Sequence, residues 1–88
     1  MKLYETITKE NWIKGVQRHP DDDVGCLMWH VRRLYGKQGD AAIVSAIKVL
    51  YPERLEPNPS RRSAIICLND HHRTTLDDVL RVCKFADR

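Results

Sequence analysis

The sequence predicts an all-α fold: a small single-domain bundle of four main helices plus one short apolar segment at residues 63–68. One reason is that four stretches place apolar residues at helical spacing and carry capping or helix-ending residues: 9–18, 24–35, 41–51 and 76–85. The other is size. A chain of 88 residues with an apolar fraction of 42% suits a single core, with an expected radius of gyration of ~12 Å. We therefore expect residues 1–88 to form one helical domain.

The first helix is expected over residues 9–18. Thr8 is a suitable N-cap, and Ile7 and Trp12 have the spacing of a hydrophobic staple. Pro20 ends this helix, because the residue before a proline avoids the α conformation. The three acids at 21–23 lack the alternating pattern of a calcium loop, so we expect them to cap the next helix.

The second helix is expected over residues 24–35, with Gly36 as its C-cap. One face carries Val24, Leu27, Met28, Val31, Leu34 and Tyr35. The opposite face carries Cys26, Trp29, His30 and Arg33. Bulky side chains on two faces are typical of a helix that is contacted from both sides. The aromatic and basic character of the second face indicates a contact with a partner or ligand.

The third helix is expected over residues 41–51, with Asp40 as N-cap and Pro52 as its end. Only Ser45 and Lys48 in it clearly require water, so we expect it to be largely buried. The proline-containing stretch 53–60 is typical of a surface loop. Residues 63–68 fit either a strand or a helix. We favour a short helix, because the chain offers no second strand to pair with it.

The last helix is expected over residues 76–85, capped by Thr74 or Thr75 with an aspartate three residues later. Residues 69–73 form a polar turn before it. The side chains of Asn69 and Asp70 are expected to bond nearby backbone groups and so to fix the approach to this helix.

Composition excludes several classes of protein. No apolar run reaches the ~18 residues of a membrane span, and the first residues lack the apolar core of a signal peptide. The three cysteines, an odd number without such a signal, indicate reduced thiols and a cytoplasmic location. A net charge of +3 is mild for a nucleic-acid-binding protein, so nucleic acid is not the expected partner.

The carboxyl-terminal third resembles the closing signature of a family of small uncharacterised bacterial and phage proteins. The resemblance is carried by Asn69-Asp70, Arg73-Thr74 and Asp78-Val79-Leu80, with earlier landmarks at Asn11-Trp12, Cys26 and the alanine-rich stretch 40–50. The family has tryptophan where this chain has Leu68, and small residues where it has Met28, Trp29 and His30. The resemblance implies a small helical domain of phage or bacterial origin, and it implies no reaction.

Catalysis and metal binding are not expected. The chain has no Gly-x-Ser-x-Gly and no Cys-x-x-Cys, which argues against a serine nucleophile and a zinc site. His71 and His72 suggest a pair of metal ligands, but the side chains of adjacent residues in a turn are expected to diverge. We therefore predict that the protein is not an enzyme and needs no metal or cofactor.

Anion binding is the more informative possibility, because basic side chains flank the apolar segment 63–68 on both sides: Arg61, Arg62, His71, His72 and Arg73. A compact helix there would place its ends only ~10 Å apart. The start of the last helix adds free amides, and guanidinium groups match phosphate in a bidentate way. An aromatic side chain of the second helix could stack on a base. We predict an anion or nucleotide site comprising Arg61, Arg62, Asn69, His71, His72, Arg73, Thr74, Trp29 and Arg33.

Three hypotheses of function follow. The first is a non-enzymatic protein that binds a phosphorylated small molecule of the nucleotide-signal type, as a homo-oligomer because one copy has little concave surface; in a phage it would sequester a host signal to blunt defence. The second is a protein-interaction module, an inhibitor or adaptor that meets a host protein through Trp29, His30 and Arg33. The third, favoured least, is a DNA-binding regulator, because residues 41–51 are too apolar for a recognition helix.

Overall fold

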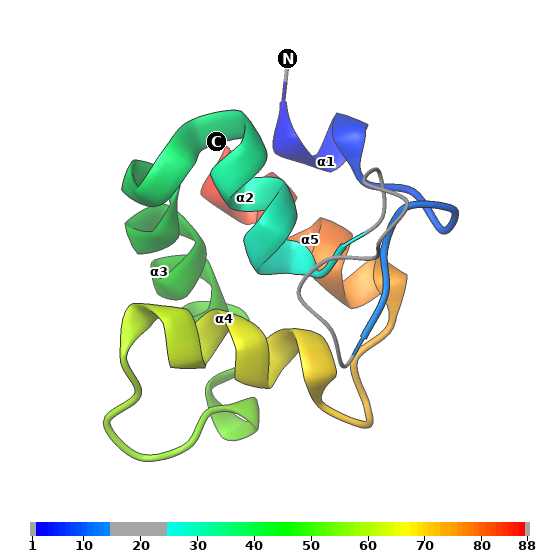
Figure 1. The fold of residues 1–88 in the computed structure, drawn as a ribbon. Coiled ribbons are helices and arrows are strands. Elements are labelled where there is room, and N and C mark those ends of the chain that lie inside the picture. The colour runs from blue at the N-terminus through cyan, green and yellow to red at the C-terminus, as the bar shows by residue number, and fades with distance from the viewer. Residues whose placement is uncertain (1, 15–24, 88) are drawn as a thin grey trace.

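The computed structural model describes residues 2–14 and 25–87, and every regular element in this part of the chain is helical (Figure 1). A short helix, α1 (Leu3–Thr6), precedes four longer ones: α2 (Leu27–Tyr35), α3 (Asp40–Leu50), α4 (Arg61–Asp70) and α5 (Leu76–Ala86). Two 3-10 turns, η1 (Gly36–Gly39) and η2 (Pro52–Arg54), flank α3. The predicted all-α fold with four main helices is confirmed, and the radius of gyration is 11.6 Å.

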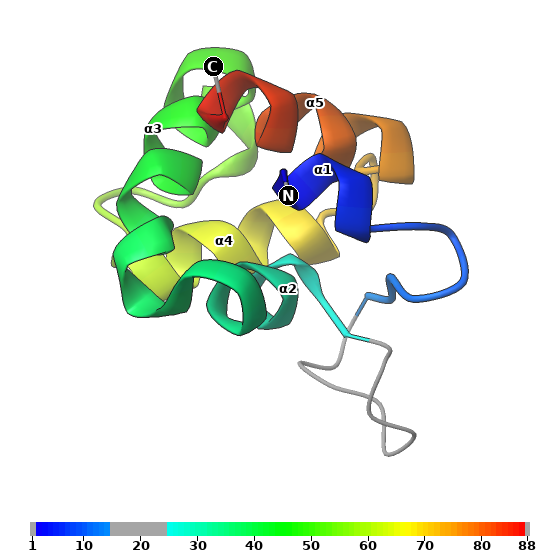
Figure 2. The ribbon, with the colours of Figure 1, turned by 90° about the horizontal axis from the view of Figure 1, so that it is seen from above.

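Helix α3 is the centre of the bundle. It packs against both α4 and α5, while α2 packs against α4, and α1 lies against α5 and α2 (Figures 1 and 2). The first and last described residues therefore lie side by side. The side chains that fill the core between these helices include Leu3, Leu27, Met28, Val31, Ile43, Ile47, Ile65, Leu68, Val79, Val82 and Cys83.

The apolar segment 63–68 belongs to a helix, as favoured, but to a longer one than expected. Helix α4 begins after Ser60, whose hydroxyl accepts the backbone N–H of Ser63 at 3.1 Å, and it continues to Asp70. Its ten residues make it one of the four main helices. The place in the bundle that we expected residues 9–18 to take is therefore filled by α4.

The helix predicted over 9–18 is wrong in its described part, residues 9–14, which form turns and extended backbone; residues 15–18 lie outside the described chain. Asn11 explains the difference. Its side-chain oxygen accepts the Thr8 N–H at 2.8 Å, and its amide nitrogen donates to the Thr6 carbonyl at 2.7 Å. Such local side-chain bonds compete with helical ones. The expected caps at 21–23 also lie outside the described residues.

Helix α2 begins at Leu27, not at 24, because Gly25 pairs with Trp12 in an isolated bridge and Cys26 is the N-cap. The predicted C-cap is confirmed. Gly36 has a φ of 69° and its N–H bonds the carbonyl of Arg32. This left-handed conformation favours glycine.

Two expectations for the third helix are wrong. Gly39, not Asp40, is the N-cap; Asp40 is the first helical residue, buried, and its carboxylate accepts Arg32 Nη2 at 3.2 Å. The helix is also not largely buried. One face is exposed, with Val49 62% accessible, and it comprises Ala41, Ala42, Ser45, Lys48 and Val49. Periodicity did not reveal this, since small and apolar residues cover both faces.

Helix α5 follows the prediction closely. Thr75 is its N-cap, and the Thr75 hydroxyl accepts the N–H of Asp78 while the Asp78 carboxylate accepts the N–H of Thr75. The two side chains therefore form a capping box in which aspartate takes the usual place of glutamate. The helix continues to Ala86.

Candidate functional site

The candidate site is the turn between α4 and α5, at residues 71–73. The N–H of Thr74 donates to the carbonyl of His71 at 2.9 Å, and the N–H of Arg73 donates to His71 Nδ1 at 3.1 Å. The rings of His71 and His72 stack with centroids 4.5 Å apart and planes 22° from parallel. The expectation that these two adjacent side chains diverge is therefore wrong. His72 and Arg73 are exposed and His71 is half-buried.

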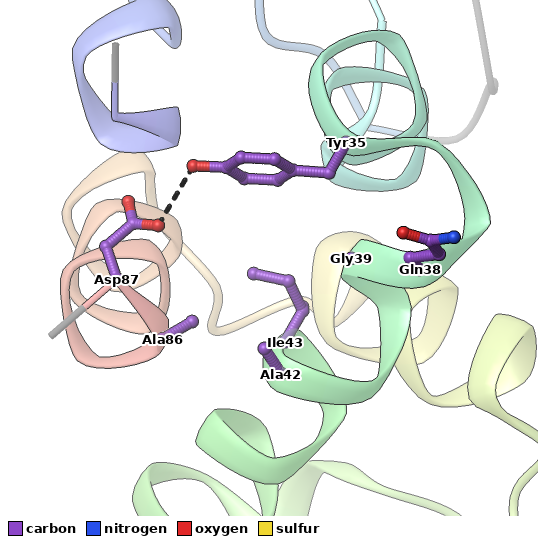
Figure 3. A pocket seen from close by; sticks show the side chains of 7 residues that line it. All are labelled: Tyr35, Gln38, Gly39, Ala42, Ile43, Ala86 and Asp87. Atoms are coloured by element: carbon purple, nitrogen blue, oxygen red, sulfur yellow. Dashed lines mark hydrogen bonds between the residues drawn. The ribbon is translucent and has the colours of Figure 1, made fainter.

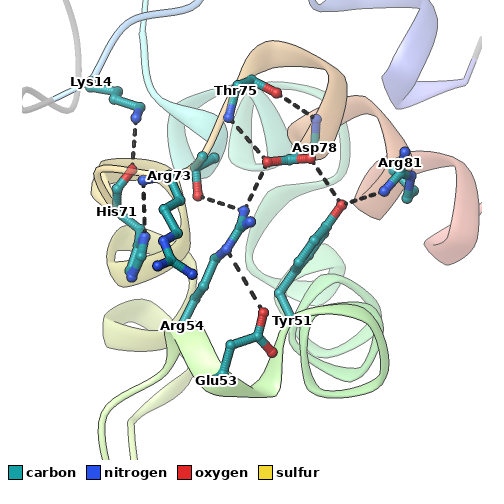
Figure 4. Close-up of polar contacts among 10 residues, drawn as sticks. Lys14, Tyr51, Glu53, Arg54, His71, Arg73, Thr75, Asp78 and Arg81 are labelled. Atoms are coloured by element: carbon teal, nitrogen blue, oxygen red, sulfur yellow. Dashed lines mark hydrogen bonds and ion pairs between the residues drawn. The ribbon is translucent and has the colours of Figure 1, made fainter.

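A lysine from the far end of the chain joins this turn. Lys14 Nζ donates to the carbonyl of His71 at 2.7 Å (Figure 4). Lys14, His71, His72 and Arg73 are named the basic turn below. Partial desolvation lowers the pKa of His71, and the positive charges of His72, Arg54, Arg73 and Lys14 lower it further. His71 therefore lies among four basic side chains.

Sequence reasoning missed Lys14 because no local pattern connects it with a residue 57 positions later. The connection runs through Asn69. This side chain is fully buried inside α4, and its oxygen accepts both Trp12 Nε1–H at 2.6 Å and the Leu27 N–H at 2.9 Å. Its amide nitrogen donates to the Ile13 carbonyl at 3.1 Å and to Asp70 Oδ1 at 2.9 Å.

Asn69 is therefore a structural residue and not a surface contact for a ligand. It was expected to bond neighbouring backbone and to fix the approach to the last helix. Instead, three of its bonds tie the amino-terminal segment and the start of α2 to α4. Docking of residues 12 and 13 in turn brings Lys14 to the basic turn.

Arg61 and Arg62 are not part of the basic turn. Both are exposed at the first turn of α4, and His71 follows its last residue. Helix α4 spans Arg61–Asp70, so the ten positions from Arg61 to His71 correspond to ~15 Å along the helix axis, and not to the ~10 Å expected for a helix over 63–68 alone. The predicted convergence of the two arginines with His71, His72 and Arg73 is wrong.

Thr74 belongs to a second buried polar network. Its hydroxyl accepts Arg54 Nη1 at 3.2 Å, and the same nitrogen donates to Asp78 Oδ2 at 2.8 Å (Figure 4). The Tyr51 hydroxyl donates to Asp78 Oδ1 at 3.1 Å and accepts Arg81 Nη1 at 3.0 Å, while the Arg54 guanidinium stacks on the Tyr51 ring. The four residues Tyr51, Arg54, Thr74 and Asp78 are named the Arg54 network.

The carboxylate of Asp78 already occupies the start of α5, so the amides there are not the open anion site that we expected. Burial alone would raise the pKa of Asp78, but hydrogen bonds from Arg54, the Thr75 N–H and Tyr51 outweigh burial and lower it. This carboxylate is therefore charged at neutral pH and neutralises Arg54.

The structure does not keep the predicted aromatic and basic residues of the second helix together on one exposed face. His30 is buried, with its Nε2–H donating to the Asn11 carbonyl at 2.9 Å, and burial lowers its pKa. Trp29 is half-buried and meets the His30 ring edge-on, while the Arg33 guanidinium lies 5.1 Å from the Trp29 ring centroid. Only Trp29 and Arg33 thus reach solvent.

None of the three cysteines, all of which lie within the described residues, is an exposed thiol. Cys26 and Cys83 are buried free thiols and Cys67 is half-buried; burial raises the pKa of Cys83 to about 12, so this thiol is inert. Within residues 2–14 and 25–87, no three His, Cys, Asp or Glu side chains are grouped so that they could hold a metal ion. Nor does any helix in these ranges have the length and apolarity to cross a membrane.

The chain matches no family model, no curated protein and no solved structure. A proposal of function therefore depends on the chemistry of the surface. The structure groups three of the predicted site residues, His71, His72 and Arg73, in one surface turn, and Lys14 joins them there.

Proposed function

We propose that this protein is a non-enzymatic binding protein that holds a phosphate-bearing small molecule at the basic turn. The observation that carries the proposal is the convergence of Lys14 on the His71 carbonyl beside Arg73. Two permanent cations and two imidazoles thus share one surface turn. The permanent cations Lys14 and Arg73 outnumber Asp70, the one acid adjacent to the turn in the sequence, so the basic turn keeps a net positive charge.

The ligand class follows from these groups. A guanidinium binds two phosphate oxygens at once, and an ammonium adds a point charge. Each charged hydrogen bond contributes ~1.5–3 kcal/mol, so three or four of them support binding at about micromolar strength after the entropic cost of association. A nucleotide-type signal is the proposed ligand, and in the phage setting that the resemblance implies, sequestering it would blunt a host defence.

The basic turn lies on the surface of one chain. We propose a homo-oligomer in which a second copy covers the other side of the ligand. The proposed location is the cytoplasm, where nucleotide signals and reduced cysteines are both found.

The test compares Arg73→Ala with Arg61→Ala, a matched control that removes the same charge from the far end of α4. Thermal shift and amide-resolved NMR would be measured with inorganic phosphate, ATP and a cyclic dinucleotide. We expect at least one of these ligands to bind, and Arg73→Ala to weaken it by about 10-fold to 100-fold, as expected for a charged hydrogen bond. Arg61→Ala is expected to leave binding unchanged.

Binding of the cyclic dinucleotide, whose phosphodiesters keep their charge, should also strengthen as the pH falls below 6.5, because its phosphates favour protonated His71 and the pKa of His71 lies below 6.5. Equal losses in both variants, or binding of none of the three probes, would overturn the proposal. Native mass spectrometry of the same samples reports the oligomeric state and any retained ligand.

The alternative is a protein-interaction module, an inhibitor or adaptor. The stacked Trp29–Arg33 pair favours it, since exposed tryptophan and arginine side chains are enriched at interface centres. Buried His30 no longer belongs to that surface. A single host protein captured in stoichiometric amount, and lost on Trp29→Ala, would favour this alternative over ligand binding.

A further inference from the structure

A pocket of about 370 Å³ opens where three helix ends meet (Figure 3). None of the residues that line it belongs to the basic turn. Its wall comes from the last residue of α2 with η1, from the first turns of α3, and from the end of α5. Tyr35, Gln38 and Asp87 supply polar groups, and Ala42, Ile43 and Ala86 supply an apolar floor. We name this the end pocket.

Small side chains keep the end pocket open. Ala42 and Ala86 fill little space, and Gly39 adds none. Glycine is required at 39, because a Cβ atom there would lie 2.8 Å from Tyr35 Cβ and 2.9 Å from Val31 Cγ1. The close approach of η1 to α2 therefore positions the Tyr35 ring along one side of the pocket.

The polar end of the pocket is the carboxylate of Asp87, which two hydrogen bonds fix in place. Asp87 Oδ1 accepts the Tyr35 hydroxyl at 3.1 Å, and Asp87 Oδ2 accepts the Leu3 N–H at 3.1 Å. Each oxygen keeps a further lone pair for a ligand. Burial, and the hydrogen bond to Asp87, raise the pKa of Tyr35, so the phenol stays protonated and donates to the carboxylate.

The charge of this end is negative. Asp87 is the one charged side chain among the described residues that line the pocket. It is also the C-cap of α5, where the helix dipole adds further negative potential. The ammonium of Lys2 bonds the main-chain carbonyl of Asp87 at 3.2 Å rather than the carboxylate.

We propose that the end pocket binds a small organic cation with an apolar body, an alkylammonium or arylalkylammonium compound. The ammonium group donates to the Asp87 carboxylate beside the Tyr35 ring, which also attracts cations. The apolar body covers Ala42, Ile43 and Ala86. The volume is at the lower end for small-molecule sites, which fits a compact ligand. This site is independent of the basic turn and has the opposite charge preference.

The first experiment uses three probes of similar size and different charge: 2-phenylethylammonium, 2-phenylethanol and 3-phenylpropionate. Each is titrated into the whole protein and followed by amide-resolved NMR. We expect shifts centred on Gly39, Ala42 and Ala86, with the ammonium bound about 10-fold more tightly than the alcohol, as expected for one charged hydrogen bond. Carboxylate binding as tight as ammonium binding would overturn the proposal.

The second experiment separates filling of the pocket from loss of folding. Ala42→Leu places bulk in the pocket, whereas Ala41→Leu adds the same group at an exposed neighbouring position outside it. We expect Ala42→Leu to weaken ammonium binding at least ~10-fold and Ala41→Leu to change it less than ~2-fold. Asp87→Asn should remove the preference for the ammonium over the alcohol. Unchanged binding in Ala42→Leu, with thermal unfolding showing a folded protein, would exclude the end pocket as the site.

Discussion

Asn69 and Arg73 stand close together in the sequence, in one polar stretch, yet the structure uses them in opposite ways. Asn69 is fully buried, and its side chain makes four hydrogen bonds. Arg73 is exposed, and its guanidinium belongs to a turn crowded with positive charge. Asn69 thus holds the fold through bonds to protein groups, whereas the exposed Arg73 is a residue for which we propose anion binding.

The basic turn lies between two hydrogen-bonded regions. The Asn69 bonds precede it in the chain, and Thr74 and Asp78, which bond Arg54, follow it. These bonds hold the residues on both sides of the turn without using its cations. The comparison predicts that substitutions in the flanks reduce stability, and that substitutions in the turn reduce ligand binding alone.

The largest expected effect is that of Asn69→Ala. The change leaves the indole N–H of Trp12 and the N–H of Leu27 without their acceptor, at a fully buried position. Stranded buried donors and the lost packing should reduce the free energy of unfolding by about 3 kcal/mol. Urea denaturation measures it. A loss in the free energy of unfolding below ~1 kcal/mol would contradict this prediction, because Asn69 would then stabilise the fold hardly more than the exposed Arg73 does.

A smaller loss is expected for Asp78→Ala. It removes the partner of Arg54 and Tyr51 and the carboxylate half of the α5 capping box, and should reduce stability by about 2 kcal/mol. The folded pKa of Asp78 lies below the ordinary value of 3.8. Its stabilising effect is therefore full above pH 3.8 and is lost as the pH falls through the lower folded value. Asp78→Asn should flatten this part of an acid-unfolding curve; an unchanged curve would contradict the assignment.

The next effect is a pH dependence caused by His30. Burial lowers its folded pKa from 6.5, so the unfolded chain takes up a proton more readily. Stability should be full above pH 6.5 and should fall as the pH drops below this value towards the folded pKa. Urea unfolding at a series of pH values measures the trend. His30→Gln should remove the part caused by His30 and leave the part caused by His71, whose pKa is also lowered. His72→Gln, in the exposed turn, should leave the trend in place.

The smallest effect is expected for Arg73→Ala on stability. Its exposed side chain should contribute less than ~0.5 kcal/mol, although the same variant weakens anion binding. Thermal and urea unfolding provide the check. A loss of stability as large as that of Asn69→Ala would show that Arg73 stabilises the fold. That result would contradict the proposal that Arg73 serves to bind an anion.

The sequence predicted the fold better than the site. Helix α5 was found because Thr75 caps it through a bond that spans three residues, and Gly36 marked the end of α2. Helix α4 was found only as its apolar segment 63–68, because no second strand was available to pair with it. The helix over 9–14 was wrong because Asn11 offered the backbone competing bonds. Within the site, His71, His72 and Arg73 were recognised as a basic cluster, but their grouping with Arg61 failed when α4 proved longer than its apolar run.

Local sequence signals were enough to predict a helical chain and the ends of most of its helices, since caps, prolines and apolar spacing act over a few residues. Which polar side chains are buried and which are exposed to a ligand depends on the tertiary structure. Asn69 and His30 were buried by residues 42 and 19 positions away, and Lys14 was brought to His71 in the same way. Such contacts depend on how helices pack, and packing joins residues whose separation in the chain carries no local signal.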